Sequence, residues 1–421
     1  MIIEFTIKNF RSIKNEQLLS FFAENKPKHH AGNISYIDNI GILKTCAIYG
    51  SNAAGKTNII LAFKALQSLI TESGDWKDGD AISCYEPYLL SKDNINQPVH
   101  FEIEFNIDDI RYLYEISFNK SEILFEKLDA FYSARSSNLF TRTSPDDWKD
   151  VKFGERYKDG KKQIAFFSNN TYLSKAGNTP DSPEIIRKIF NYFRRDIFTM
   201  RSNEHIGISG WHDNERVLTA INTFLKKIDL GINNFTMEST VLPKGFELPK
   251  DFELPEILKK QILDDLSKEP TFHHETDYGE FINFDMSKES MGTIKIFRVL
   301  PFLIDALKNG FTIFIDEIEN SYHPHIAELL IKLFNDPLVN KNNAQLIFTT
   351  HDLTLMTSKT MRKDQIYLTK KDIRQGTTIE CLENFDIKDN SPFQKWYDEG
   401  RLGSIPTINY RDISDAIREA F

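Results

Sequence analysis

Hydrophobic and polar residues alternate with a period of two in two parts of the chain. Within the first ten residues, Ile3, Phe5 and Ile7 alternate with polar side chains. The same period returns over residues 99–132, where Asp108 and Asp109 separate two of the apolar runs. Alternation of this kind is typical of strands with one buried face. It predicts an N-terminal strand and an antiparallel β meander.

Three short and almost continuous apolar runs predict a second kind of strand. They are "TCAIY" at 45–49, "FTIFI" at 311–315 and "AQLIFTT" at 344–350. Strands buried on both faces occupy the centre of parallel sheets. Helical spacing follows the first run, and the stretch 292–310 predicts a helix kinked at Pro301 and closed by Gly310.

The pattern becomes helical between the two kinds of strand. Ser182 is predicted to cap a helix that has Pro183 at its first position, and residues 215–228 and 255–266 have helical spacing. We therefore predict an α/β fold with a central, mostly parallel sheet. Its N-terminal part spans 1–178, a mainly helical insertion spans 179–279, and its C-terminal part spans 280–421.

Composition narrows the class of protein. The chain has 421 residues, 40% hydrophobic, with a net charge of −9 and three widely spaced cysteines. Disulfide frameworks and zinc sites need closer or paired cysteines. No apolar run approaches a membrane span, and the first residues lack the features of a signal peptide. We expect a cytoplasmic protein that is not bound to membranes and meets nucleic acid, if at all, through a local basic patch.

The segment "GSNAAGKT", residues 50–57, has the pattern of a phosphate-binding loop. Its glycines let backbone N–H groups surround a phosphate, its lysine reaches the β- and γ-phosphates, and its threonine hydroxyl binds Mg²⁺. A strand before it and a helix after it are the context that the motif requires. The predicted ligands are ATP and Mg²⁺, and the predicted nucleotide-binding residues here are Gly50, Asn52, Ala53, Ala54, Gly55, Lys56 and Thr57.

Two adjacent acids, Asp316 and Glu317, follow the apolar run 311–315. At the carboxyl end of a strand beside a phosphate loop, the first acid is placed to hold Mg²⁺ together with Thr57. The second is placed to polarise an attacking water. Asp316 is therefore a predicted metal ligand and Glu317 a predicted catalytic residue.

Two further motifs flank these acids in the sequence. Ser290 and Gly292 open the helix predicted at 292–310, and a helix N-terminus of this kind binds anions. One chain does not easily present two such sites to a single triphosphate, so we expect Ser290 and Gly292 to serve a neighbouring subunit. His351 directly follows the third apolar run and is the predicted donor to the γ-phosphate.

The order of these motifs resembles that of the ABC-type P-loop ATPases. The opening "IEFTIKNFRSIKN" and Asn58 after the G-K-T resemble the branch that contains RecF and the SMC proteins. Further segments, "FFSNNTYLS", "IDEIENSYHPH" and "WYDEGRLGSIP", resemble RloA/AbiL-type ATP-binding proteins of the AAA family from anti-phage loci. The resemblance adds Asn58 to the nucleotide-binding residues. It implies Ser290 and Gly292 acting in trans, Glu317 as catalytic carboxylate and His351 as switch histidine.

The resemblance also implies a function. It implies an ATPase that senses infection and controls a separately encoded effector nuclease of TOPRIM or RNA-cleaving type, in a homodimer or larger homo-oligomer with shared ATP sites. The stretch after His351 is too short for a fused TOPRIM domain. The alternative is a RecF-like DNA-repair ATPase that closes on DNA when ATP drives dimerisation.

Some positions depart from the family pattern or stay open. Glu289 stands where a leucine commonly opens the signature, which puts the packing of that helix in question. Gln67 and Gln97 are both candidates for the Q-loop glutamine. Arg11 is a candidate to face the nucleotide, and the stretch 397–406 is assigned to a subunit or partner contact.

Overall fold

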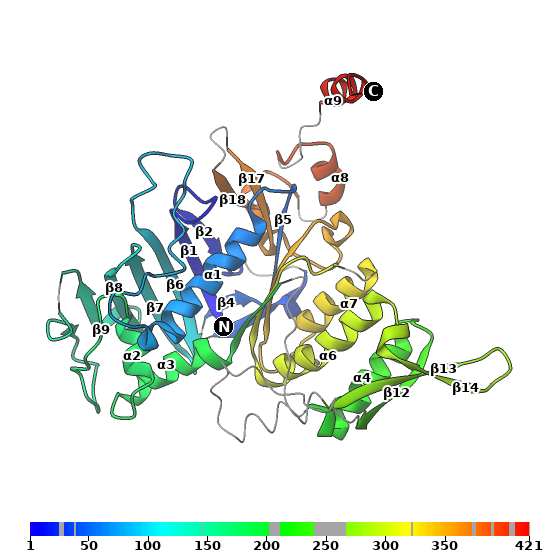
Figure 1. The fold of residues 1–421 in the computed structure, drawn as a ribbon, viewed down its shortest axis with the longest axis horizontal. Helices are drawn as coiled ribbons and strands as arrows, with labels where there is room; N and C mark the ends of the chain where they lie inside the picture. The colour runs from blue at the N-terminus through cyan, green and yellow to red at the C-terminus, as the bar shows by residue number, and fades with distance from the viewer. Residues whose placement is uncertain are drawn as a thin grey trace.

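Two large sheets form the frame of the molecule in this computed structural model (Figure 1). The structure describes residues 1–421 except 25–28, 38, 146, 202–210, 240–266, 321–322, 373–375, 389–390, 404–408 and 421. The first sheet has the order β11-β15-β16-β5-β17-β18, and all its neighbours are parallel except β17 and β18. Its strands are β5 (Thr45–Gly50), β11 (Ile197–Met200), β15 (Thr312–Ile315), β16 (Gln345–Thr350), β17 (Ile366–Lys371) and β18 (Thr377–Cys381).

Successive residues of the central strands pack into two different cores, as expected for a sheet buried on both faces. On β5, Cys46 and Ile48 belong to one core, whereas Ala47 and Tyr49 belong to the other. The first core also contains the buried face of α1 (Lys56–Thr71). The second contains α6 (Met291–Asn309) and α7 (Pro324–Asn335). The prediction of a central, mostly parallel sheet is confirmed.

The second sheet is antiparallel and contains the predicted meander. Its order is β10-β9-β8-β7-β6-β1-β2. Asp108 and Asp109 have φ of 47° and 63°, the left-handed pair that a tight hairpin requires. The strands are β1 (Ile2–Lys8), β2 (Gln17–Ser20), β6 (Val99–Ile107), β7 (Ile110–Phe118), β8 (Ile123–Phe131), β9 (Ser136–Thr143) and β10 (Lys152–Phe153).

The segment "FFSNNTYLS" forms a buried joint between helices. Thr171 caps α2 (Tyr172–Gly177) by accepting from the N–H of Ser174 at 3.0 Å. Asn170 donates to the carbonyl of Ser73 at 2.6 Å, just beyond the end of α1. Glu126, fully buried on β8, accepts from the N–H of Tyr172 at 2.7 Å. These contacts give the motif a structural role at the end of the fold opposite the phosphate loop.

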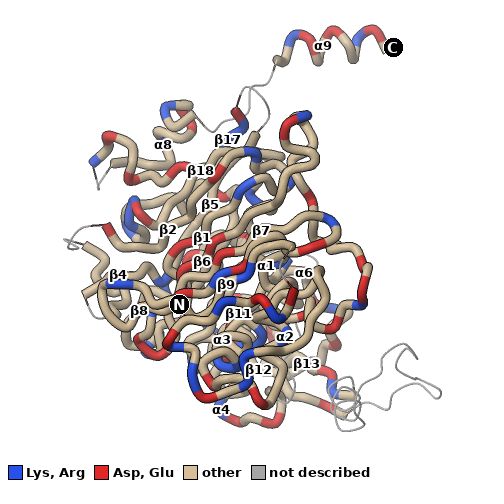
Figure 2. The backbone as a smooth tube through the Cα atoms, turned by 90° about the vertical axis from the view of Figure 1, so that its left-hand side faces the viewer, with Lys and Arg blue, Asp and Glu red and all other residues tan. Residues whose placement is uncertain are grey.

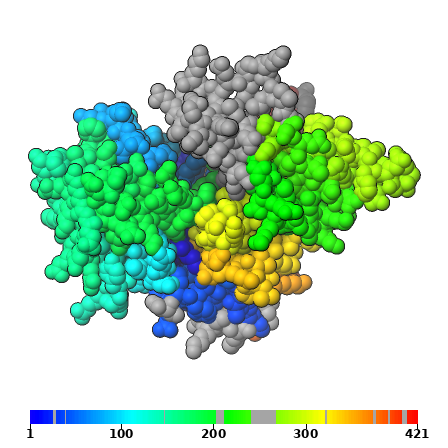
Figure 3. All heavy atoms as spheres, turned by 90° about the horizontal axis from the view of Figure 1, so that it is seen from below, coloured from blue at the N-terminus to red at the C-terminus, as the bar shows by residue number. Residues whose placement is uncertain are grey.

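The described residues of the segment 179–279 form strands as well as the predicted helices, and the mainly helical insertion stays a prediction. The segment contains α3 (Glu184–Arg195) and α4 (Glu215–Lys227), but also β11, β12 (Ile232–Ser239) and β13 (Lys268–Glu275). β12, β13 and β14 (Phe281–Asp285) form a separate antiparallel sheet. Figure 3 shows α4 and this sheet, green to yellow-green, on the side of the molecule away from the meander. The helix predicted at 255–266 lies outside the described residues.

The start of α3 also differs from the prediction. The helix begins at Glu184 with Pro183 at the N-cap, and the hydroxyl of the buried Ser182 makes no capping bond. The carbonyl of Pro183 accepts the first helical bond, from Ile186 at 3.1 Å. By contrast, α6 continues through Pro301, and Gly310 ends it with a φ of 77°.

Further elements belong to none of these three sheets, and β3 pairs with β4 in a sheet of its own. They are β3 (Ile34–Ile37), β4 (Ile40–Leu43), α8 (Phe393–Asp398) and α9 (Tyr410–Arg418). In Figure 2 acidic and basic residues are interleaved along the backbone, α9 included. Within the described ranges, no helix has the length and apolarity to cross a bilayer.

One buried side chain joins the two sheets. Gln345, at the start of β16, accepts from the N–H of Ile2 at 2.8 Å and donates to the carbonyl of Ile2 at 2.9 Å. Its amide also donates to the carbonyl of Leu43 at 3.0 Å. Since Gln345 is fully buried, these bonds satisfy backbone groups that would otherwise lose hydration.

Candidate functional site

The phosphate loop runs from the end of β5 to the start of α1, and its glycines are sterically required. A Cβ on Gly50 would lie 2.6 Å from the carbonyl oxygen of Thr369. Gly55 has a φ of 103°, and a Cβ there would lie 2.2 Å from the hydroxyl of Thr377. β17 and β18 therefore lie so close to the loop that only glycine fits at positions 50 and 55. Ala53 also has a positive φ, of 62°.

Side chains from the N-terminus and from β18 hold the loop from outside. The hydroxyl of Thr377 donates to the carbonyl of Ala54 at 2.8 Å and lies 2.7 Å from the hydroxyl of Ser12. Asn58 donates to Ser12 at 2.6 Å and accepts from Arg11 at 3.1 Å. Arg11 also pairs with Glu86. Arg11 and Asn58 thus lie together at the first turn of α1, beside the loop.

Lys56 lies within the loop and is 5% exposed. Its Nζ donates to the carbonyl of Gly50 at 2.8 Å and to that of Ser51 at 3.3 Å. Burial lowers the pKa of Lys56 to about 8, although the carboxylates of Asp316, Glu317 and Glu319 act in the opposite direction. The ammonium group is therefore a buried cation surrounded by the oxygens of the loop.

The side chains of Thr57 and Asp316 meet across α1 and β15. The Thr57 hydroxyl donates to the Asp316 carboxylate at 3.0 Å. Thr349, from β16, donates to the same carboxylate at 2.6 Å. Asp316 is only 7% exposed, so these donors replace much of the hydration that its charge loses on burial.

Glu317 and His351 form the open side of this cluster. Glu317 has a φ of 55°, and its N–H donates to the Thr349 hydroxyl at 2.8 Å. His351 Nδ1 lies 3.2 Å from Lys56 Nζ, and its Nε2 lies 3.6 Å from Glu317 Oε1. A protonated Lys56 donates only to an unprotonated Nδ1, which leaves the ring hydrogen on Nε2, facing Glu317. The histidine ring thus links the cation to the second acid.

Two residues in the cluster are not among the predicted site residues. Thr349 joins Asp316 to the backbone of Glu317, and Glu319 accepts from the N–H of His351 at 2.6 Å. Both stand inside the quoted segments, Glu319 as the third acid of "IDEIENSYHPH" and Thr349 in "AQLIFTT". The quoted segments contain both residues, but their hydrogen bonds form only because β15 pairs with β16, which the segments alone do not show.

The helix start at Ser290 and Gly292 is built separately from this cluster. The Ser290 hydroxyl caps α6 by accepting from the N–H of Thr293 at 3.1 Å. Glu289, which departs from the family pattern, lies 2.6 Å from His274 Nε2 on β13, and its side chain is 6% exposed. His274 therefore contacts the residue that directly precedes Ser290.

The two glutamine candidates have structural contacts. Gln67 donates to the carbonyl of Phe193 at 2.7 Å and to that of Ile197 at 2.9 Å, which joins α1 to α3 and β11. Gln97 is exposed, and its carbonyl accepts from Asn9 at 2.9 Å beyond the end of β1. These contacts do not connect either side chain to the phosphate loop.

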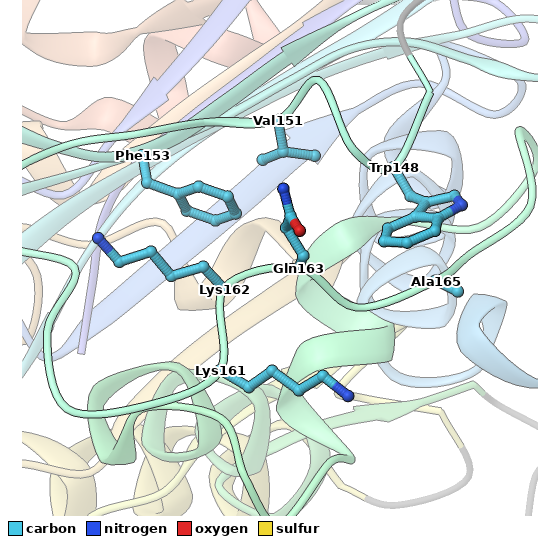
Figure 4. A pocket seen from close by; sticks show the side chains of 7 residues that line it. All are labelled: Trp148, Val151, Phe153, Lys161, Lys162, Gln163 and Ala165. Atoms are coloured by element: carbon cyan, nitrogen blue, oxygen red, sulfur yellow. The ribbon is translucent and has the colours of Figure 1, made fainter.

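Two cavities are relevant to ligand binding. One, of about 400 Å³, lies beside the loop and is lined by Tyr49, Gly50, Ser51, Asn52, Thr350, His351, Leu353 and Tyr397. A larger one, of about 680 Å³, lies at the far edge of the meander between Trp148, Phe153 and Lys162 (Figure 4). The larger cavity contains none of the predicted site residues, so the smaller one is the better candidate for a nucleotide-binding site.

The residues beside the smaller cavity fit ATP and Mg²⁺. The close approach at Gly50 and Gly55 leaves a loop of backbone N–H groups next to a buried ammonium, which suits phosphate oxygens. Thr57 and Asp316 bring a hydroxyl and a carboxylate to one point, and Mg²⁺ prefers such oxygen ligands. Lys56, Thr57 and Asp316 would therefore hold the nucleotide and its metal ion.

Comparison with models of known protein families gives a match over most of the chain. The family model described as "AAA domain, putative AbiEii toxin, Type IV TA system" matches residues 46–357. None of the curated proteins compared matches the chain.

Three of the solved structures that match the chain do so at low sequence identity and low TM-score. The SMC head domain from Thermotoga maritima is 14% identical, with a TM-score of 0.38, over 90% of this chain and 98% of that chain. The Smc head domain from Pyrococcus furiosus bound to the C-terminal domain of ScpA is 13% identical, with a TM-score of 0.39, over 95% and 99%. CbiO1 from Clostridium perfringens, part of the ABC transporter complex cbiONQ, is 11% identical, with a TM-score of 0.27, over 89% and 86%.

The family match covers more than half of the chain and spans the phosphate loop, both acids and His351. The chain therefore belongs to this AAA domain family.

Proposed function

We propose that the protein binds and hydrolyses ATP with Mg²⁺ and uses the nucleotide as a switch that controls a separate effector nuclease in anti-phage defence. One observation carries the enzymatic part of this proposal. Lys56, Thr57, Asp316, Glu317 and His351, which come from three separate parts of the sequence, form one connected cluster. The family description, with its reference to a toxin–antitoxin system, supports the defence context.

The geometry gives each residue a distinct task. Lys56 offsets phosphate charge from a buried position, while Thr57 and Asp316 would hold Mg²⁺, which supplies further charge neutralisation. Glu317 is 39% exposed on its side chain and lies next to these groups. It is placed to take a proton from a water molecule, and the hydrogen on His351 Nε2 would help to orient its carboxylate.

The separate position of Ser290 and Gly292 supports a shared site. Ser290 caps its own helix, and Met291 beside it is 73% exposed, so this helix start is open to a neighbour. We propose that a second copy of the chain presents Ser290 and Gly292 to the nucleotide held by the first. ATP would then close a homodimer or a larger homo-oligomer, and hydrolysis would open it.

A RecF-like DNA clamp is the second candidate function. It shares the ATP-driven dimer but needs a basic surface, whereas this chain has a net charge of −9. Purification of the native protein from its own cells, followed by mass spectrometry, separates the two candidates. We expect a co-encoded nuclease to be recovered. Tight, ATP-dependent DNA binding without a protein partner would favour the clamp instead.

The Glu317→Gln variant tests the catalytic assignment. It keeps the Thr57 and Asp316 oxygens but removes the base, so we expect ATP affinity within about threefold of wild type and turnover lowered at least about 100-fold. Phosphate release and equilibrium binding measure the two effects. Glu383→Gln, a change at a distant partly exposed acid, serves as control, and wild-type turnover in Glu317→Gln would contradict the assignment.

Mixing two inactive variants tests the shared site. Lys56→Ala removes the cation of the loop, whereas Ser290→Asp keeps a helix cap but places a negative charge against the phosphates. When equal amounts of the two variants form dimers at random, half of the dimers are hybrids. Each hybrid has one complete site of its two, so the mixture should show about a quarter of the wild-type rate. If the mixture stays inactive while hybrids are shown to form, each chain builds its own site.

The pKa of Lys56 predicts proton uptake on nucleotide binding. At pH 8 about half of the free protein has a neutral Lys56, and a bound triphosphate favours the charged form. Binding should therefore take up about 0.5 proton at pH 8 and much less at pH 6.5, and affinity should fall as pH rises above 8. Calorimetry in buffers of different ionisation heat measures the uptake.

Two variants test whether Lys56 is the group that takes up this proton. Lys56→Arg stays charged throughout this range, so its residual binding should show no such uptake. Lys64→Ala, at a lysine exposed on the same helix, should keep it. Equal uptake in wild type and Lys56→Arg would show that the proton goes to another group.

A further inference from the structure

The C-terminal part of the chain contributes a side chain to the nucleotide site. The cavity of about 400 Å³ beside the phosphate loop is lined by Ser51 and Asn52 on one side and by His351 on another. Tyr397, from α8, completes its lining. Since Lys56 Nζ contacts both the Ser51 carbonyl and His351, this cavity adjoins the position where the loop would hold the terminal phosphate.

Tyr397 is held in place by packing. It is 6% exposed and belongs, with Phe393 and Leu402, to the same core as Tyr49 at the end of β5. Gly400, with a φ of 72°, donates its N–H to the carbonyl of Tyr397 at 2.9 Å and turns the chain after α8. Tyr397, the first residue of the stretch that the sequence interpretation assigned to a subunit or partner contact, thus lines a cavity together with Ser51 and Asn52 of the phosphate loop.

Polar side chains line this cavity. Within the part of the chain that the structure describes, the cavity lining has no carboxylate. Tyr49, which also lines the cavity, is fully buried, and its hydroxyl makes no hydrogen bond to the described residues. A buried hydroxyl without a hydrogen-bond partner destabilises the fold unless a ligand or a water molecule forms a hydrogen bond with it. The cavity is thus lined by several residues with polar side chains, and one of these residues, His351, also contacts the carboxylates of Glu317 and Glu319.

We propose that Tyr397 is a nucleotide-binding residue that recognises the terminal phosphate of ATP, so that α8 distinguishes ATP from ADP. The inference rests on the proposed ATP site and adds a C-terminal recognition element to it. A tyrosine hydroxyl donates to a charged phosphate oxygen with a strong hydrogen bond, and ADP has no phosphate at that position. The state of the nucleotide would then affect the position of α8.

The Tyr397→Phe variant tests the recognition. It keeps the packed ring and removes the hydroxyl alone, so folding should be preserved. We expect affinity for a non-hydrolysable ATP analogue to fall about tenfold and affinity for ADP to stay within twofold. Tyr410→Phe, at a tyrosine that is 78% exposed on α9, is the matched control and should change neither value. An unchanged ratio of the two affinities in Tyr397→Phe would overturn the proposal.

Trp396 provides a second measurement on the same helix. In a variant with Trp76, Trp148 and Trp211 changed to phenylalanine, Trp396 is the one remaining tryptophan of the four. Its emission should change with the ATP analogue, change less with ADP, and stay constant when Lys56→Ala is added. If wild-type protein binds no nucleotide, the proposed function fails. If wild type binds both nucleotides but Trp396 responds equally to them, only the role of α8 fails.

Discussion

The carboxylate of Asp316 is the acceptor on which the geometry of the site depends. Thr57 donates to it from α1 at 3.0 Å and Thr349 donates from β16 at 2.6 Å, so one buried charge joins a helix to two strands. The Thr349 hydroxyl in turn accepts from the N–H of Glu317. This bond helps to hold Glu317 at a φ of 55°, which non-glycine residues rarely adopt. The position of the proposed base thus depends on the bonds of the metal ligand.

Sheet topology explains why residues far apart in sequence reach this acceptor. β15, β16 and β5 are parallel neighbours, so the segments that follow them leave the sheet at the same edge. Asp316 follows β15, His351 follows β16, and the phosphate loop follows β5. Gln345 then fixes the other end of β16 to the N-terminal strand through the backbone of Ile2. β11, which belongs to the long segment between the loop and α6, is also parallel to β15, so this segment reaches the same edge at Met200.

The sequence predicted those site residues whose motif contains both the reactive side chain and the local structure that positions it. Lys56 and Asp316 belong to this class, because a glycine loop and an apolar strand place them without knowledge of distant contacts. Glu289 and His274 do not, since their contact depends on how β13 packs against the start of α6. The strands in 179–279 were missed for a related reason: β13, "KEPTFHHE", has a proline and charges in a short half-buried strand. Its pairing with two neighbours overrides that weak local signal.

The proximity of Tyr397 to the phosphate loop shows the same limit most clearly. No local sequence pattern relates Tyr397 in α8 to Ser51. The two residues line the same cavity only because β5 pairs with β16 and α8 packs on the second core. The position of Tyr397 also suggests how the proposed nucleotide-dependent switch works. His351 touches both Lys56 and Glu317, and it lines the cavity with Tyr397. Nucleotide binding, the proposed base and the C-terminal segment therefore share one histidine, so a change at the terminal phosphate has a direct physical route to each of them.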